Sequence, residues 1–124
     1  MRITLCGSTR FRQQYEDINR RLSKQGHVVY SVSSFGHSGD VLTEQEKATL
    51  DRVHLAKIDN SDAIVVLNVD NYIGESTTRE IAHAKATGKD IYYFDGRASG
   101  RAMCPYAGCG DSLLNSPPCA LCYE

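Results

Sequence analysis

The stretch MRITLCGSTRF (residues 1–11) combines a short apolar run, a glycine turn and the first residue of a helical pattern. The run ITLC (3–6) predicts a buried strand that breaks at Gly7. Ser8 and Arg10 follow the break, just before the helical pattern begins at Phe11. A strand, a tight glycine turn, a hydroxyl group and an arginine at a helix N-terminus suit a bound phosphate group. We therefore predict an anion site at Gly7, Ser8 and Arg10.

The residue types of this turn also allow a simpler interpretation. In it, Ser8 caps the following helix and Arg10 is a solvated surface residue. The turn lacks the lysine and glycine spacing of a P-loop, and it is not a GxGxxG dinucleotide fingerprint. Support for anion binding therefore has to come from the rest of the chain.

Apolar runs and helical patterns alternate from the first stretch to residue 95. This order predicts an α/β fold in which a parallel sheet of about four to five strands is covered by helices on both sides. The most apolar run, AIVVLNV, is expected to form the central strand because strands buried on both faces are continuously apolar. The predicted strands are residues 2–6, 27–32, 63–69 and 90–94.

Three helices are expected between these strands. Apolar residues spaced by four, three and four positions from Phe11 to Leu22 define one face of the first helix. Thr43 and Glu46 form a capping box, so the second helix should start there and run towards Asp59. The third helix is expected within REIAHAKATG (79–88), which ends in a glycine.

Parallel α/β sheets bind ligands beyond the carboxyl ends of their strands. In this chain three segments follow those ends: residues 7–10, 33–40 and 70–80. The predicted site is therefore assembled from three loops that are far apart in the sequence.

Composition limits the classes of function. The chain has 124 residues, of which 41% are hydrophobic and 23% charged, and this suits one globular domain of modest size. A net charge of −1 gives no general attraction to nucleic acid, and no apolar run is long enough to span a membrane. We also find no signal peptide, so we expect a cytoplasmic protein with reduced cysteines.

The segment IGESTTREIAHAKATGK (73–89) carries two carboxylates around a hydroxyl-rich turn. Glu80 is expected at or just inside the start of the third helix. In the simplest interpretation Thr77 caps that helix and Glu80 is the matching capping-box glutamate. Upstream, His54 is expected to be a packing or surface residue of the second helix, and Asp62 is a turn residue before the central strand.

Three motifs in this order resemble the nucleoside 2-deoxyribosyltransferase-like family: LCGSTR, SDAIVVLN and GESTTREIAHAKATGK. That family includes the deoxynucleoside 5′-monophosphate N-glycosidases, whose first turn also reads Cys-Gly-Ser-x-Arg. The resemblance covers about residues 1–95 and implies a flavodoxin- or Rossmann-like three-layer fold. It also implies a homodimer, because relatives complete the pocket with a neighbouring subunit.

The resemblance assigns roles to individual residues. Glu80 matches the family's nucleophile, and Ser8 and Arg10 match the groups that hold a 5′-phosphate. The aspartate that assists catalysis has no secure match; Asp59 is preferred and Asp62 is the alternative. Many relatives have glycines where this chain has Ser76 and Thr78. The substrate-binding residues expected on this basis are Gly7, Ser8, Arg10, His37, Ser76 and Thr78.

The chemistry of these residue types agrees with the resemblance. Cleavage of an N-glycosidic bond builds oxocarbenium character at C1′, which a carboxylate such as Glu80 can capture covalently. The leaving base needs a proton or a hydrogen bond, for which Asp59 and His37 are candidates. The predicted function is hydrolysis or transfer of the N-glycosidic bond of a (deoxy)nucleoside 5′-monophosphate, without a catalytic cofactor. The alternative is a nucleotide-binding sensor or sequestering module without turnover.

Residues 97–124 differ in character from residues 1–96 and are rich in Gly, Pro, Ser and Cys. Their four cysteines are spaced as C-x4-C and C-x2-C, which predicts a zinc-knuckle-like module. A site with four thiolates has no open position for water, so the zinc is expected to be structural. A tail with reduced thiols is the alternative, and Cys6 is expected to be a small core residue. The expected zinc ligands are Cys104, Cys109, Cys119 and Cys122.

Overall fold

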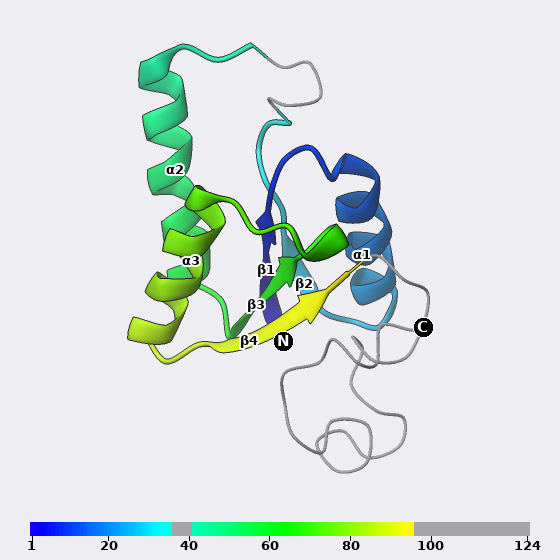
Figure 1. Cartoon of the computed structure of the whole chain (residues 1–124). Coiled ribbons are helices and arrows are strands. Elements are labelled where there is room, and N and C mark those ends of the chain that lie inside the picture. Colours follow the sequence, from blue (N-terminus) through cyan, green and yellow to red (C-terminus); the bar gives the residue numbers. More distant parts are fainter. Residues whose placement is uncertain (36–40, 96–124) are drawn as a thin grey trace.

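The computed structural model describes residues 1–35 and 41–95. These residues form a three-layer α/β fold, in which helices pack on both faces of a parallel sheet (Figure 1). The strand order in the sheet is β2-β1-β3-β4, and each neighbouring pair is parallel. The three-layer fold predicted from the sequence is therefore confirmed, with four strands. The elements are β1 (Arg2–Gly7), α1 (Arg12–Lys24), β2 (Val28–Tyr30), α2 (Glu44–Asp59), β3 (Ala63–Leu67), the 3-10 helix η2 (Val69–Asn71), α3 (Glu75–Ala86) and β4 (Asp90–Phe94).

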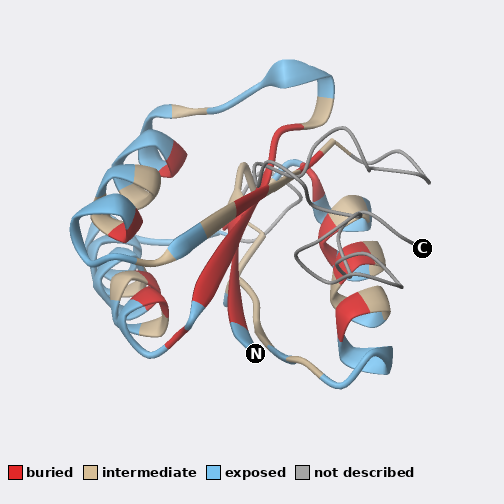
Figure 2. Cartoon of the chain, turned by 90° about the horizontal axis from the view of Figure 1, so that it is seen from below, coloured by how far each residue is buried: buried red, intermediate tan, exposed pale blue. Residues whose placement is uncertain are grey.

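Helices cover both faces of the sheet. Helix α1 lies on one face, and α2 and α3 lie together on the other (Figure 1). The two central strands β1 and β3 are buried almost throughout, β2 and β4 only in part, and the outer faces of the helices are exposed (Figure 2). Strands alternate their side chains between two faces, so one sheet supplies two separate cores. Ile3 and Leu5 of β1 pack with α1, whereas Cys6 packs with Ile58 of α2 and Ala84 of α3.

Helix α1 follows the predicted pattern. Tyr15, Ile18 and Leu22 are buried against the sheet, as is Phe11 just before the helix. Burying each side chain of this size is worth roughly 1.5–3 kcal/mol, which fixes the helix on this face. The Tyr15 hydroxyl also donates a 2.7 Å hydrogen bond to the carbonyl oxygen of Gly7. Helix α1 therefore holds the turn that ends β1.

Gly7 at the end of β1 cannot be replaced without strain. Its φ is +151°, and an added Cβ would lie 2.9 Å from the Cβ of Leu67 on the neighbouring strand. Both features require glycine, because other residues avoid this backbone region and because the strands leave no room for a methyl group. The chain can therefore turn sharply at the carboxyl edge of the sheet while β1 and β3 stay paired.

The second helix starts as predicted. Thr43 accepts a hydrogen bond from the Glu46 backbone N–H, and the Glu46 side chain accepts one from the Thr43 N–H. This reciprocal capping box fixes the first turn of α2. Only the last part of the helix is buried, at His54 and Ile58, and the first turns extend beyond the sheet (Figure 1).

Helix α3 starts four residues earlier than predicted, and this corrects the capping interpretation of Glu80. Its N-cap is Gly74, which has an extended backbone conformation and makes no side-chain capping bond. Thr77 lies inside the first turn and is buried, so it does not cap the helix. Glu80 lies in the second turn and is not a capping-box residue. In this helical segment the backbone N–H and the hydroxyl of Thr78 both donate to the Gly74 carbonyl oxygen.

Three further details differ from the sequence prediction. Strand β2 begins at Val28, because the backbone N–H of His27 bonds to Leu22 and belongs to the end of α1. Strand β3 ends at Leu67, because Asn68 starts the 3-10 helix η2. Ser8 is not a helix cap either: Phe11 is the N-cap of α1, and the Ser8 Oγ accepts from the Arg10 N–H at 3.2 Å.

In the part of the chain that the structure describes, no helix is long and apolar enough to cross a membrane. His37 and the whole predicted second module lie outside the described residues. The zinc ligation predicted for Cys104, Cys109, Cys119 and Cys122 therefore stays a prediction.

Candidate active site

A cavity of about 440 Å³ lies at the carboxyl edge of the sheet, where the sequence predicts ligand binding. It is lined by the turn after β1, by the segment after β2, by one side of α2 and by the first turns of α3. The helix side chains that face it include both acidic and basic groups: Lys47, Asp51, His54, Lys57, Glu75 and Glu80. The cavity is therefore a polar site built on buried strands.

Glu80 is the buried carboxylate of this cavity. Its side chain is 16% exposed, and it projects from the second turn of α3 towards the end of β1. Burial raises the pKa of Glu80 to about 7 from an ordinary value of 4.5. A hydrogen bond from the Cys6 thiol and the charge of Arg79 partly oppose that rise, whereas the nearby Asp51 carboxylate adds to it. Glu80 is therefore half ionised near neutral pH.

His54 of α2 faces Glu80 but does not neutralise it. The His54 Nε2 lies 3.7 Å from the Glu80 Oε1. That distance would suit an ion pair, but burial, together with the positive charge of Lys57, lowers the pKa of His54 to about 4. Asp51 and a hydrogen bond with the Leu5 backbone only partly oppose this shift. At neutral pH His54 is uncharged, so the contact with Glu80 is not an ion pair.

Cys6 is a core residue, as the sequence predicts, but its thiol also belongs to the site. The Sγ lies 3.5 Å from the His54 Nε2 and hydrogen-bonds with Glu80. Burial, followed by the charge of Glu80, raises the pKa of Cys6 well above its usual range, so the thiol stays protonated. We call these three residues the Cys6–His54–Glu80 cluster. Each comes from a different element, and sequence reasoning identified only Glu80.

The turn after β1 forms the rim that the sequence predicts for an anion. Ser8 and Thr9 line the cavity, but the Arg10 side chain does not. The Arg10 guanidinium instead lies over the ring of Tyr72, 4.2 Å from its centroid, and Tyr72 lines the cavity. No acidic side chain among the described residues pairs with Arg10. Its charge therefore stays available beside the mouth of the cavity.

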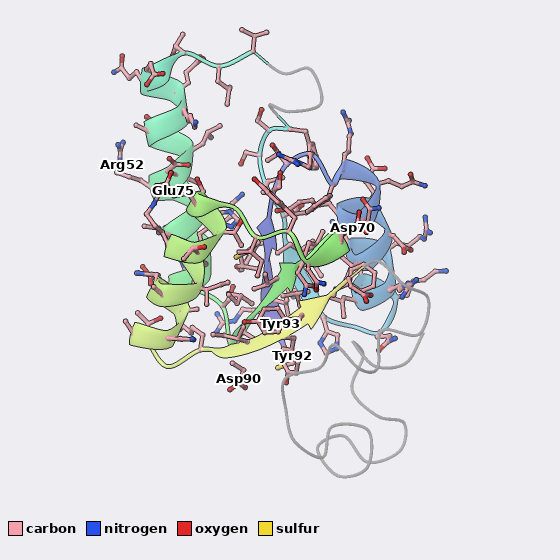
Figure 3. All side chains as sticks on the ribbon, in the orientation of Figure 1. Arg52, Asp70, Glu75, Asp90, Tyr92 and Tyr93 are labelled. Carbon is pink, nitrogen blue, oxygen red and sulfur yellow. The ribbon has the colours of Figure 1, made fainter. Side chains whose placement is uncertain are left out.

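The N-terminus of α3 opens on the same cavity. Gly74 and Ser76 line it, and no side chain caps the first backbone N–H groups of the helix. Glu75 lies at this end of α3 (Figure 3) and adds a negative charge to the first turn. Thr78, expected to bind substrate, does not line the cavity, because its hydroxyl bonds to the Gly74 carbonyl oxygen inside the helix.

Asp59 lies at the end of α2, as predicted, but away from the cavity. Its Oδ1 lies 2.7 Å from the His83 Nε2, at the end of α2 that is remote from the cavity. The alternative, Asp62, accepts a hydrogen bond from the Arg2 N–H at the opposite edge of the sheet. Asp51 is the aspartate that lines the cavity, about two helical turns before Asp59. Two helical turns span about 12 Å along α2. Asp51 therefore lies near the carboxyl edge of the sheet, and Asp59 lies towards the opposite edge.

Lys57 fixes the wall formed by the segment after β2. Its Nζ donates to the Ser31 carbonyl oxygen at 2.7 Å and to the Ser33 Oγ at 3.1 Å. Burial lowers the pKa of Lys57 somewhat. Together with Lys47, it brings positive charge to a cavity that also holds Asp51 and Glu75. The walls thus carry both positive and negative side chains, and the buried floor carries the Glu80 carboxyl group.

The raised pKa of Glu80 predicts a pH-dependent cost in stability. The unfolded chain ionises Glu80 above about pH 4.5, whereas the folded chain resists ionisation until about pH 7. The folded state therefore loses about 3 kcal/mol as pH rises through this window. Glu80→Gln removes that loss. The difference in the free energy of unfolding between Glu80→Gln and wild type should therefore shift in favour of the variant by about 2–3 kcal/mol from pH 5 to pH 8.

Urea unfolding of both proteins at several pH values measures this difference. Glu75→Gln is the matched control, because Glu75 lines the same cavity but is exposed at the first turn of α3. We expect its effect to stay below about 1 kcal/mol over the same range. A Glu80→Gln difference that does not change with pH would mean that the carboxylate is not destabilised by burial.

Comparisons with known proteins identify the fold. No protein-family model and no curated protein sequence matches the chain. Among solved structures, a 2-deoxyribosyltransferase from Bacillus psychrosaccharolyticus aligns with a TM-score of 0.63 at 19% identity, covering 76% of this chain and 72% of that one. A 2-deoxyribosyltransferase from Leishmania mexicana aligns with a TM-score of 0.59 at 14% identity, covering 99% and 77%. The chain therefore has the fold of the 2-deoxyribosyltransferases.

Proposed function

We propose that this protein cleaves the N-glycosidic bond of nucleosides or nucleoside 5′-monophosphates, with Glu80 as the nucleophile. One observation carries the proposal: Glu80 is a buried carboxylate that faces a cavity, and its nearest basic neighbour, His54, is uncharged at neutral pH. A carboxylate without a cationic partner in a buried site stabilises positive charge that develops nearby. The likeness to 2-deoxyribosyltransferases supports the same assignment through the shared fold.

The reaction proceeds in two steps. A carboxylate oxygen of Glu80 bonds to C1′ of the sugar, and the C1′–N bond breaks, so the base leaves with the electron pair and takes up a proton. Water then attacks C1′ from the opposite face, gives up a proton and releases the Glu80 carboxylate. If a second base attacks instead of water, the same intermediate gives transfer. Two inversions at C1′ retain the configuration of the sugar.

Asp51 replaces Asp59 as the residue that assists the leaving base. It lines the cavity from α2 and lies close enough to Glu80 to raise the pKa of that residue. Its carboxyl group can hydrogen-bond the base or pass it a proton. Cys6 and His54 act as positioning residues, because they contact Glu80 from β1 and α2 and fix its side chain against the floor.

We further propose that a 5′-phosphate binds between the turn after β1 and the start of α3. Ser8, Thr9 and the uncapped N-terminus of α3 face the same cavity, and Arg10 lies beside its mouth. Backbone N–H groups, hydroxyl groups and a guanidinium are the donors that phosphate prefers. Because Glu75 adds negative charge to the first turn of α3, the phosphate should lie nearer to Arg10.

The first test is turnover by Glu80→Gln. Gln keeps the size of the side chain and removes the charge that meets the developing cation at C1′, so we expect the rate to fall by several orders of magnitude. Binding of the nucleotide should persist, because the turn after β1 is unchanged. Release of free base from a panel of deoxyribo- and ribonucleosides and their 5′-monophosphates, measured by chromatography, checks the rate.

Glu75→Gln is the control for that assay and should retain most of the wild-type rate. The wild-type rate should also rise with pH through about 7, since only ionised Glu80 can attack. A wild-type protein that binds the nucleotides tightly but releases no base from any of them would instead be a sensor or sequestering module. Near wild-type turnover by Glu80→Gln would exclude Glu80 as the nucleophile.

The second test separates phosphorylated from unphosphorylated substrates. Arg10→Ala removes a charge-assisted contact worth on the order of 1.5–3 kcal/mol, so binding of monophosphates should weaken roughly ten- to a hundredfold. Binding of the corresponding nucleosides should hardly change. Arg12→Ala is the matched control, because Arg12 is exposed two positions away and pairs with Glu16 at 3.4 Å. Equal losses for both kinds of substrate would show that Arg10 does not contact the phosphate.

A further inference from the structure

The Cys6–His54–Glu80 cluster has the composition of a metal site. It offers one sulfur, one imidazole nitrogen and one carboxylate oxygen, and these atoms all lie within 4.8 Å of one another. They come from β1, α2 and α3, so the sheet and both helices on that face hold them in place. We propose that this cluster binds a Zn²⁺ ion. The ion coordinates the Glu80 carboxylate and thereby blocks the reaction proposed above.

The distances between the ligand atoms fit a tetrahedral zinc centre. Zinc binds Cys sulfur at about 2.3 Å, His nitrogen at about 2.0–2.1 Å and carboxylate oxygen at about 2.0–2.2 Å. In a tetrahedron these bond lengths separate neighbouring ligand atoms by roughly 3.3–3.6 Å. The His54 Nε2 lies 3.5 Å from the Cys6 Sγ and 3.7 Å from the Glu80 Oε1. These two distances match a tetrahedral centre, and the Cys6 Sγ and the Glu80 carboxylate, which lie within 4.8 Å of each other, would complete it by side-chain adjustment.

The surroundings of the cluster also suit zinc. The Cys6 thiol is a single donor that contacts two acceptor groups, His54 and Glu80, so it can satisfy only one of them at a time. A metal ion in place of the thiol proton would bind all three side chains at the same time. His54 hydrogen-bonds with the Leu5 backbone, and metal-bound histidines commonly have an outer partner of this kind. His54 and Glu80 line the cavity, so the fourth position on the metal is open to water.

The ligand types select the class of ion. A thiolate and an imidazole favour zinc over Mg²⁺ and Ca²⁺, which prefer oxygen ligands. Binding releases the thiol proton of Cys6 to solvent, and also the proton of Glu80 when that group is protonated. Coordination ties one Glu80 oxygen to the ion and draws the negative charge of the carboxylate towards it, so Glu80 becomes a much poorer nucleophile towards C1′. Zinc at this position is therefore an inhibitor of the proposed reaction and not its cofactor.

The test counts metal ions on the full chain and locates them. After equilibrium dialysis against Zn²⁺, wild type should bind one zinc per chain more than each of Cys6→Ser, His54→Gln and Glu80→Gln. Comparing full-length proteins cancels any zinc held by residues 97–124, which all of them share. Glu75→Gln is the matched control, because it changes a carboxylate of the same cavity outside the cluster, and it should bind as many ions as wild type. Circular dichroism and thermal unfolding identify any variant that fails to fold.

Crystals of wild type soaked in Zn²⁺ provide a readout without any substitution. Anomalous scattering at the zinc edge should show a peak within bonding distance of Cys6, His54 and Glu80. Equal zinc counts for wild type and the three folded variants, or no peak at the cluster, would overturn the proposal. Neither measurement needs turnover: a chain that binds the extra zinc but releases no base in its metal-free form would contradict the proposed function alone, whereas an active chain that binds no extra zinc would contradict the metal site alone.

Discussion

The carboxylate of Glu80 is buried beside a neutral imidazole and a neutral thiol, and the properties of the site follow from this contact. Burial without a cationic partner raises the pKa of Glu80 to about 7 and makes its ionised form costly. The rest of the fold must supply the free energy that keeps it there. Two apolar cores do so, one under α1 and one under α2 and α3. The same burial makes the ionised carboxylate reactive towards a developing cation.

The position of this carboxylate depends on the register of the sheet. Cys6 pairs with Val66 of β3 and points to the face that α2 and α3 cover, whereas Leu5 points to the face of α1. A shift of one residue would reverse these faces and remove the thiol from the site. Gly7 then turns the chain into the rim of the cavity, where Tyr15 holds its carbonyl oxygen. One short strand thus supplies both the floor beneath Glu80 and the proposed phosphate-binding turn.

Much of the fold could be predicted because its signals are local. Continuous apolar runs indicated parallel strands, and the Thr43–Glu46 capping box placed the start of α2 correctly. The resemblance of short motifs predicts Glu80 as a site residue, and the structure shows that Glu80 lines the cavity. The start of α3 was misplaced because Gly74 caps the helix through backbone geometry, which residue types alone do not reveal.

The errors in the site concern contacts between elements. The sequence analysis names Asp59 and Asp62 but not Asp51, because helical periodicity does not say which turn of α2 reaches the carboxyl edge of the sheet. The contacts of Cys6 and His54 with Glu80 are not predicted by the sequence, because each residue alone is typical of a core or a helix surface. The alternation of faces along β1 was the available signal for Cys6, but its partner on α2 becomes known only when the helix is packed.

The central claim is that Glu80 attacks C1′, and trapping of the intermediate tests it most directly. A 2′-fluoro nucleotide slows the second step, because the fluorine disfavours the positive charge that forms at C1′ again when the ester is cleaved. After incubation of wild type with this compound, the account predicts a sugar adduct on the peptide that contains Glu80, located to that residue by tandem mass spectrometry. An adduct on Asp51 or Glu75, or release of the base without any adduct, would contradict it.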